Sequence, residues 1–117
     1  MSDVDPRRMH PCDALDVLDF ELQEAVLRGG ASGREEDATV VRIVIRGRNF
    51  RNGAVPLTAR VGDVVVELLR LDEGAQTLEG VLLREPERDA RVRVSYLDME
   101  WVEHPVGYDP ERVVRIR

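Results

Sequence analysis

The stretch that decides the fold is TVVRIVIRGRNF, residues 39–50. Val41, Ile43 and Ile45 recur at every second position, and arginine occupies two of the positions around them. Successive side chains of a β-strand point to opposite faces, so this alternation predicts a strand with one buried face. A fold built around such a strand is rich in β-structure.

The alternation breaks near the end of this stretch. Phe50 lies an odd number of positions after Ile45, so a regular strand would point the two side chains in opposite directions. Gly47 stands at the break. Glycine within a strand often marks a bulge or a sharp bend. We therefore expect the chain to bend at Gly47 and to turn Phe50 back toward the core.

Further short apolar runs, separated by turn residues, predict more strands. The dipeptide Gly62-Asp63 between two such runs favours a tight type II′ hairpin. The alternating residues 90–96 give the second clearest strand pattern. In the last run, Val114 and Ile116 are expected to point inward. The predicted strands cover residues 39–50, 57–61, 64–71, 78–82, 90–96 and 112–117.

Residues 15–28, LDVLDFELQEAVLR, fit two interpretations. Leu18, Phe20 and Leu22 alternate with acidic residues, as they would in a strand. The same stretch also offers an apolar helical face, and its leucine, glutamate and alanine content favours a helix by intrinsic propensity. The pattern alone leaves both alternatives open.

Six or seven short strands spaced about ten residues apart are typical of an antiparallel β-sandwich or barrel. The length of 117 residues suits one domain. Hydrophobic residues make up 43% of the chain, enough for a core, but aromatic residues only 4%, so valine, leucine and isoleucine must fill it. We expect one domain over residues 15–117, preceded by a flexible polar N-terminal arm over residues 1–14.

The order of these features resembles the IPT/TIG branch of immunoglobulin-like domains. The resemblance rests on residues 39–50 with their Gly-x-Asn-Phe ending, on the ARVGDVVV hairpin (59–66) and on the alternating RVRVSY strand (91–96). It implies an all-β, antiparallel immunoglobulin-like β-sandwich of about seven short strands. It also implies that residues 15–28 form the first strand. Such domains serve as spacers, contact modules and dimerisation surfaces, and the resemblance assigns no functional residue.

Charge is distributed unevenly along the chain. Residues 1–38 contain ten acids and four arginines, a net charge of −6, whereas residues 39–117 contain thirteen of each. A chain without a basic surplus is a poor match for a phosphate backbone, so nucleic acid is not expected as a partner. The chain contains no lysine, and interleaved arginine and glutamate favour cross-strand ion pairs.

The sequence points to a cytoplasmic location. No apolar run approaches the ~20 residues needed to cross a bilayer, and the N-terminus lacks the apolar block of a secretory signal. The single Cys12 allows no internal disulfide and fits a reducing compartment.

Groups for catalysis or cofactor binding are scarce. The only histidines are His10 and His104, and no serine lies in a nucleophile motif. Met9, His10 and Cys12 stand close together, but a structural zinc site needs about four ligands and the second pair is missing. We therefore expect no enzymatic activity, no metal and no cofactor.

Residues 98–111, DMEWVEHPVGYDPE, form the most distinctive segment in a chain poor in aromatic residues. Tryptophan, tyrosine and methionine, which this segment contains, are enriched at contact surfaces. They also suit the alternative role of covering the open end of a small core. The predicted partner-contact residues are Met99, Trp101, His104 and Tyr108.

These observations predict a non-catalytic protein-interaction or structural module, a subunit of a larger bacterial or phage assembly. Its partner would be another protein or a second copy of the chain. The alternative is a small-ligand module that stacks carbohydrate on Trp101 and Tyr108.

Overall fold

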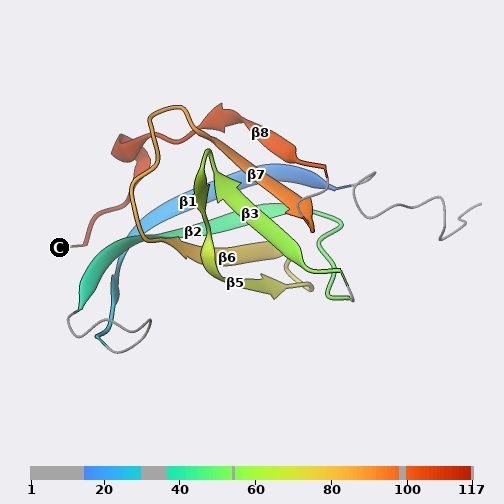
Figure 1. Cartoon of the computed structure of the whole chain (residues 1–117), viewed down its shortest axis with the longest axis horizontal. Helices are drawn as coiled ribbons and strands as arrows, with labels where there is room; N and C mark the ends of the chain where they lie inside the picture. Colours follow the sequence, from blue (N-terminus) through green and yellow to red (C-terminus); the bar gives the residue numbers. More distant parts are fainter. Residues whose placement is uncertain (1–14, 30–36, 54, 98–99, 117) are drawn as a thin grey trace, which may run out of the picture.

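The computed structural model describes residues 15–29, 37–53, 55–97 and 100–116. The N-terminal arm expected over residues 1–14 lies outside these ranges. The described residues form eight β-strands and one short 3₁₀ helix (Figure 1). In chain order these are β1 (Asp16–Leu27), β2 (Ala38–Arg48), β3 (Leu57–Val61), β4 (Val64–Val65), β5 (Glu67–Asp72), β6 (Thr77–Leu82), β7 (Arg91–Tyr96), β8 (Val102–Gly107) and η1 (Pro110–Arg112).

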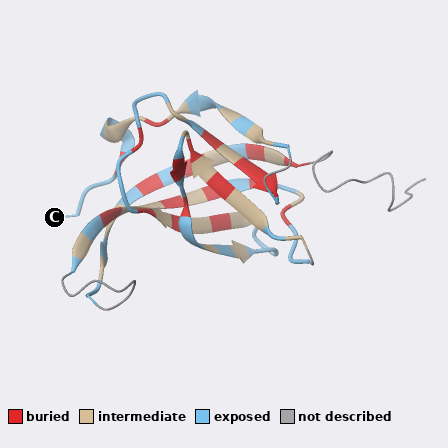
Figure 2. Cartoon of the chain, viewed as in Figure 1, coloured by how far each residue is buried: buried red, intermediate tan, exposed pale blue. Residues whose placement is uncertain are grey.

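The strands form two antiparallel four-stranded sheets. The first has the order β1-β2-β6-β5 and the second the order β4-β3-β7-β8. Apolar side chains from both sheets join in one core, and the buried residues gather where the sheets face each other (Figure 2). The predicted all-β, antiparallel class is confirmed. The strand count differs, with eight strands in the described ranges instead of about seven.

Within residues 15–28 the chain forms the strand β1 (Asp16–Leu27), and the helix favoured by propensity is wrong. β1 pairs with β2 along its whole length. Phe20 and Leu22 are each 3% exposed and contribute to the core. Cross-strand pairing and burial outweigh intrinsic preference here, as they commonly do in sheets. Leu18 does not share this face, because a register shift after Val17 leaves it 41% exposed.

The end of β2 turns Phe50 into the core, as the sequence predicts. Phe50 is completely buried. The turn comes from Asn49, whose φ of 63° lies in the left-handed region that asparagine tolerates better than most residues. The register shift lies on β1, opposite Gly47, and not within β2 itself.

The predicted return strand over residues 64–71 is two strands in different sheets. Gly62 has a φ of 60°, which suits the tight turn that joins β3 to β4. The chain then crosses at Val66, whose backbone N–H donates to Ala59 O at 3.0 Å, and continues as β5 in the first sheet. Valine and leucine are dense on both sides of the crossing, so the composition of residues 64–71 gives no sign of the change of sheet.

The predicted final strand over residues 112–117 is also wrong. The last strand is β8, and the chain then passes through η1, whose N-terminus is capped by the Asp109 side chain. This helix shifts the phase of the residues that follow. Val113 is therefore buried, whereas Val114 and Ile116 are 64% and 50% exposed.

Candidate functional site

The residues of the 98–111 segment that were predicted to form a contact site do not form one patch. Met99 lies outside the described residues. Trp101, His104 and Tyr108 belong to β8 or its immediate flanks, yet each has different surroundings.

Tyr108 is a core residue. It is 1% exposed, and its hydroxyl donates to Glu85 Oε2 at 3.4 Å. Burial, together with the negative charge of Glu85 and this hydrogen bond, raises the pKa of the Tyr108 hydroxyl above its usual range. Its backbone N–H donates to Ala90 O, which holds the end of β8 against the start of β7. Tyr108 therefore offers no ring surface to a partner or a sugar.

His104 joins β8 to β1. Nδ1 lies 3.1 Å from the Val106 backbone N–H, and Nε2 lies within hydrogen-bonding distance of Leu18 O, at 3.2 Å. The ring also meets Phe20 edge-on, with 5.3 Å between ring centroids. His104 thus links the two sheets at one corner, where β1 is bulged.

Trp101 precedes β8 and lies over the outer face of the second sheet. The Cζ atoms of Arg60 and Arg93 are 5.7 Å and 5.5 Å from its ring centroid, within the range of cation–π interaction. Arg60 on β3 and Arg93 on β7 are direct cross-strand partners. Both alternate with core valines, Val61 and Val92, so their side chains leave the sheet on its outer side.

Arg93 is only partly satisfied by its neighbours. Its Nη2 donates to Gly62 O at 3.0 Å, and its Nη1 lies 4.0 Å from Glu103 Oε2. Its Nε is buried and has no hydrogen-bond partner. The guanidinium is held in place beside Trp101, but its charge is weakly neutralised.

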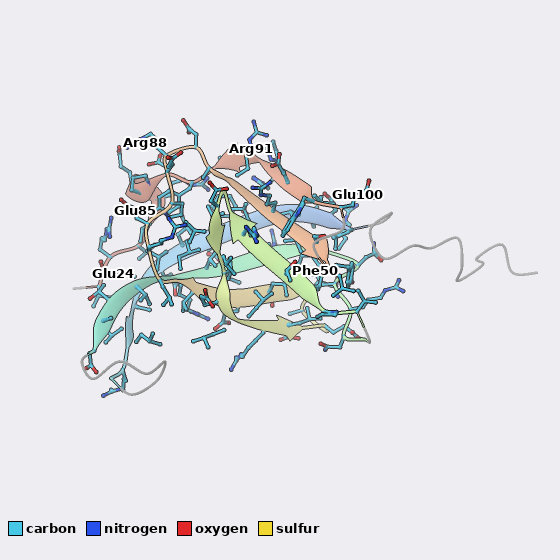
Figure 3. All side chains as sticks on the ribbon, in the orientation of Figure 1. Glu24, Phe50, Glu85, Arg88, Arg91 and Glu100 are labelled. Carbon is cyan, nitrogen blue, oxygen red and sulfur yellow. The ribbon has the colours of Figure 1, made fainter. Side chains whose placement is uncertain are left out.

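We name the outer residues Arg60, Arg91, Arg93 and Trp101 the arginine–tryptophan face. Arg91 is exposed and shares the outward phase of Arg93; Figure 3 shows it at the end of β7 opposite to Glu100. Neither Arg60 nor Arg91 forms an ion pair with another described residue. Among the described residues, Glu103 is the one carboxylate that forms an ion pair with a guanidinium of this face, that of Arg93.

The outer face of the first sheet has the opposite character. Arg42 donates through Nε to Glu79 at 2.9 Å and through Nη1 to Gln23 at 2.9 Å. Arg46 pairs with Asp19 at 3.2 Å. The Arg42 hydrogen bond lowers the pKa of Glu79, and Glu79 in turn raises that of Arg42. The cross-strand ion pairs expected from the interleaved charges are confirmed here for Arg42 and Arg46.

Sequence reasoning found Trp101 but missed the arginines that it contacts. The alternation in residues 59–61 and 91–94 does place Arg60 and Arg93 on an outer face. The local pattern does not predict that β3 pairs with β7, because about thirty residues separate the two strands in the sequence. That pairing brings the two guanidiniums together.

In the described ranges, no group of three His, Cys, Asp or Glu side chains is arranged to hold a metal ion. His10 and Cys12 lie outside the described residues. Within those same ranges, no helix has the length and apolar character needed to cross a membrane.

One cavity of about 230 Å³ opens between β3 and β5. Four of its nine lining residues are leucines, and neither a carboxylate nor an imidazole is among them. Its lining residues are Arg51, Asn52, Gly53, Val55, Pro56, Leu57, Leu69, Leu71 and Leu78.

Comparison with protein-family models found no match for this chain, and comparisons with curated proteins and with solved structures found none either. The class of protein is therefore inferred from the strand order and from the geometry of the arginine–tryptophan face.

Proposed function

We propose that the chain is an immunoglobulin-like domain of the IPT/TIG type. Immunoglobulin-like sandwiches have strands A-B-E-D in one sheet and C, F and G in the other, and some add C′ to the second sheet. Lettering the present strands in chain order turns β1-β2-β6-β5 into A-B-E-D and β4-β3-β7-β8 into C′-C-F-G. This agreement, together with residues 39–50, supports the assignment.

We further propose that the domain binds a protein partner through the arginine–tryptophan face, as a non-catalytic subunit of a larger assembly. The observation that carries this proposal is the direct opposition of Arg60 and Arg93 beneath Trp101. Like charges in directly opposed cross-strand positions are destabilising. A fold retains such a local cost chiefly where function requires it.

The composition of the face also suits protein recognition. Tryptophan and arginine are enriched at interfaces and dominate the binding energy of many of them. Trp101 is half-buried, and the contacts with two guanidiniums fix its ring before a partner arrives. A pre-positioned ring loses little conformational entropy on binding.

Three of the four sheet edges, those of β1, β4 and β8, are less suited to binding another chain. β4 has only two residues, and β8 contains Pro105, which lacks a backbone N–H. On the edge of β1, Val114 exchanges backbone hydrogen bonds with Leu22 and Glu24. Short strands, proline and covered edges are devices that oppose edge-to-edge pairing. A partner is therefore expected to bind the face of the second sheet.

The test is a quantitative affinity purification from cells that make the chain at native abundance. Trp101→Ala and Arg60→Glu should each release a partner that the unchanged chain retains, since both remove part of the face without altering the core. Arg46→Glu on the first sheet is the matched control and should retain the partner.

Two outcomes would contradict the proposal. One is a chain that purifies as a lone monomer without any specific partner. The other is a partner that is retained equally by Trp101→Ala and by Arg60→Glu.

A further inference from the structure

We propose that the arginine–tryptophan face recognises an acidic polypeptide segment in an extended conformation. Carboxylates of the segment would pair with Arg60, Arg91 and Arg93, and an apolar side chain would lie on Trp101. This inference names the partner chemistry of the proposed function and rests on it.

Charge complementarity is the first argument. Among the described residues, the one ion pair formed by the three guanidiniums of the face is that of Arg93 with Glu103, at 4.0 Å. Arg42 on the first sheet, by contrast, has two 2.9 Å contacts with Glu79. Arginine presents a planar fork of donors that fits carboxylates in a bidentate manner. The face therefore has guanidinium N–H donors that can bind anionic groups of a partner.

The spacing of the arginines is the second argument. Arg91 and Arg93 lie two positions apart on one strand, which separates their Cα atoms by about 6.8 Å. In an extended peptide, side chains at positions i and i+2 point to the same side with that same repeat of about 6.8 Å. Arg60 lies across from Arg93 on the neighbouring strand. An acidic-x-acidic segment running along β7 thus matches the row of guanidiniums.

A phosphate backbone fits the molecule less well. Proteins that bind single-stranded nucleic acid also combine a cationic groove with aromatic side chains on which bases stack, and Trp101 could provide such stacking. Such binding draws on a basic potential over a broad surface. This chain carries a net charge of −6, and on the first sheet Arg42 and Arg46 are paired with carboxylates. A short acidic peptide needs only the local surplus of positive charge on the outer face of the second sheet.

The single tryptophan of the chain makes a direct test possible. The probe is the synthetic peptide acetyl-Glu-Leu-Glu-Ser-Glu-amide, added to the full chain at low ionic strength while Trp101 fluorescence is followed. We expect a saturable change in emission that weakens strongly near 1 M salt, where the screening length falls to about 3 Å. The lysine counterpart of the peptide should produce no change.

Charge variants connect this response to the face. Arg93→Gln and Arg60→Gln should each weaken peptide binding by about 3- to 10-fold, the range expected for one charge-assisted contact at a partly exposed site. Arg46→Gln, on the first sheet, should bind the peptide as the unchanged chain does. A folded state should be verified for each variant by circular dichroism.

The inference is overturned if the acidic peptide leaves the emission unchanged, if Arg46→Gln weakens binding as much as Arg93→Gln does, or if oligothymidylate binds more tightly than the peptide. These outcomes are separable from failure of the proposed function. If Trp101→Ala releases a protein partner but the acidic peptide leaves the emission unchanged, the proposed binding face stands and the proposed acidic partner is wrong.

Discussion

The ring of Phe50 lies directly against the α-carbon of Gly47. A β-carbon at Gly47 would overlap both this ring and the carbonyl oxygen of Asp16 on the neighbouring strand. The bare glycine therefore gives Phe50 the space that it occupies in the core, and the left-handed Asn49 supplies the turn. The Gln76 side chain then fixes the position, since it accepts from Phe50 N at 2.9 Å and donates to Phe50 O at 2.8 Å.

Gly47→Ala should lower the free energy of unfolding by about 2–3 kcal/mol, because the overlap forces both a core ring and a backbone strand to move. The measurement is unfolding in urea monitored by circular dichroism. Gly53→Ala is the matched control, as no atom lies within 4 Å of the position of an added β-carbon. Equal stability of the two variants would contradict the role of Gly47.

The phase of the C-terminal segment gives a second prediction. Val113→Ala should cost about 2 kcal/mol of stability, because Val113 is buried in the core. Val114→Ala should change stability by less than about 0.5 kcal/mol, as expected for a largely exposed side chain. The measurement is the denaturant midpoint of each variant. A larger loss of stability for Val114→Ala than for Val113→Ala would contradict the observed phase and favour the strand predicted for residues 112–117.

The Arg42–Glu79 pair should contribute modestly to stability and in a pH-dependent way. The hydrogen bond from Arg42 lowers the pKa of Glu79 in the folded state. The contribution is therefore present above the usual glutamate pKa of about 4.3 and is lost as the pH falls below it. Both side chains are about one-third exposed, and solvent screening limits the coupling to about 0.5–1 kcal/mol.

A double-mutant cycle with Arg42→Gln and Glu79→Gln measures this coupling at neutral pH and again under acidic conditions. The coupling should shrink on acidification. A coupling that is the same at both pH values would contradict the assigned cause.

Tyr108 should make the domain sensitive to alkali. Its pKa is raised in the folded state, chiefly by burial, so the protonated hydroxyl is favoured by folding. The resulting stability is fully present below the usual tyrosine pKa of about 10 and is lost as the pH rises through the folded value. Tyr108→Phe should abolish this loss. Thermal unfolding midpoints between about pH 8 and 11 provide the measurement.

Local alternation predicted the buried faces of β2, β3, β6 and β7, because each of these strands has one face in the core. It also predicted the burial of Phe50. The errors arose where another interaction decided the outcome. Pairing with β2 overrode the helical preference of residues 15–28, and η1 moved the inward position from Val114 to Val113.

The candidate site was only partly predictable. Trp101 was conspicuous as the single tryptophan, whereas Tyr108 carries the same aromatic signal and is a core residue. The sequence could not distinguish them, since exposure depends on which strands cover each ring. Arg60 and Arg93 became candidates only through the register between β3 and β7.

The contact of the C-terminal segment with β1 bears on the order of folding. Glu24 binds Arg115 at 3.2 Å across 91 positions of sequence. During synthesis from the N-terminus, the edge of β1 stays open until that distant segment has been made. Loops of this length close slowly, because the chain loses entropy before the contact forms. The nascent chain would thus lack these contacts on the β1 edge until Val114 and Arg115 are made, and this interval is when chaperone protection would matter most.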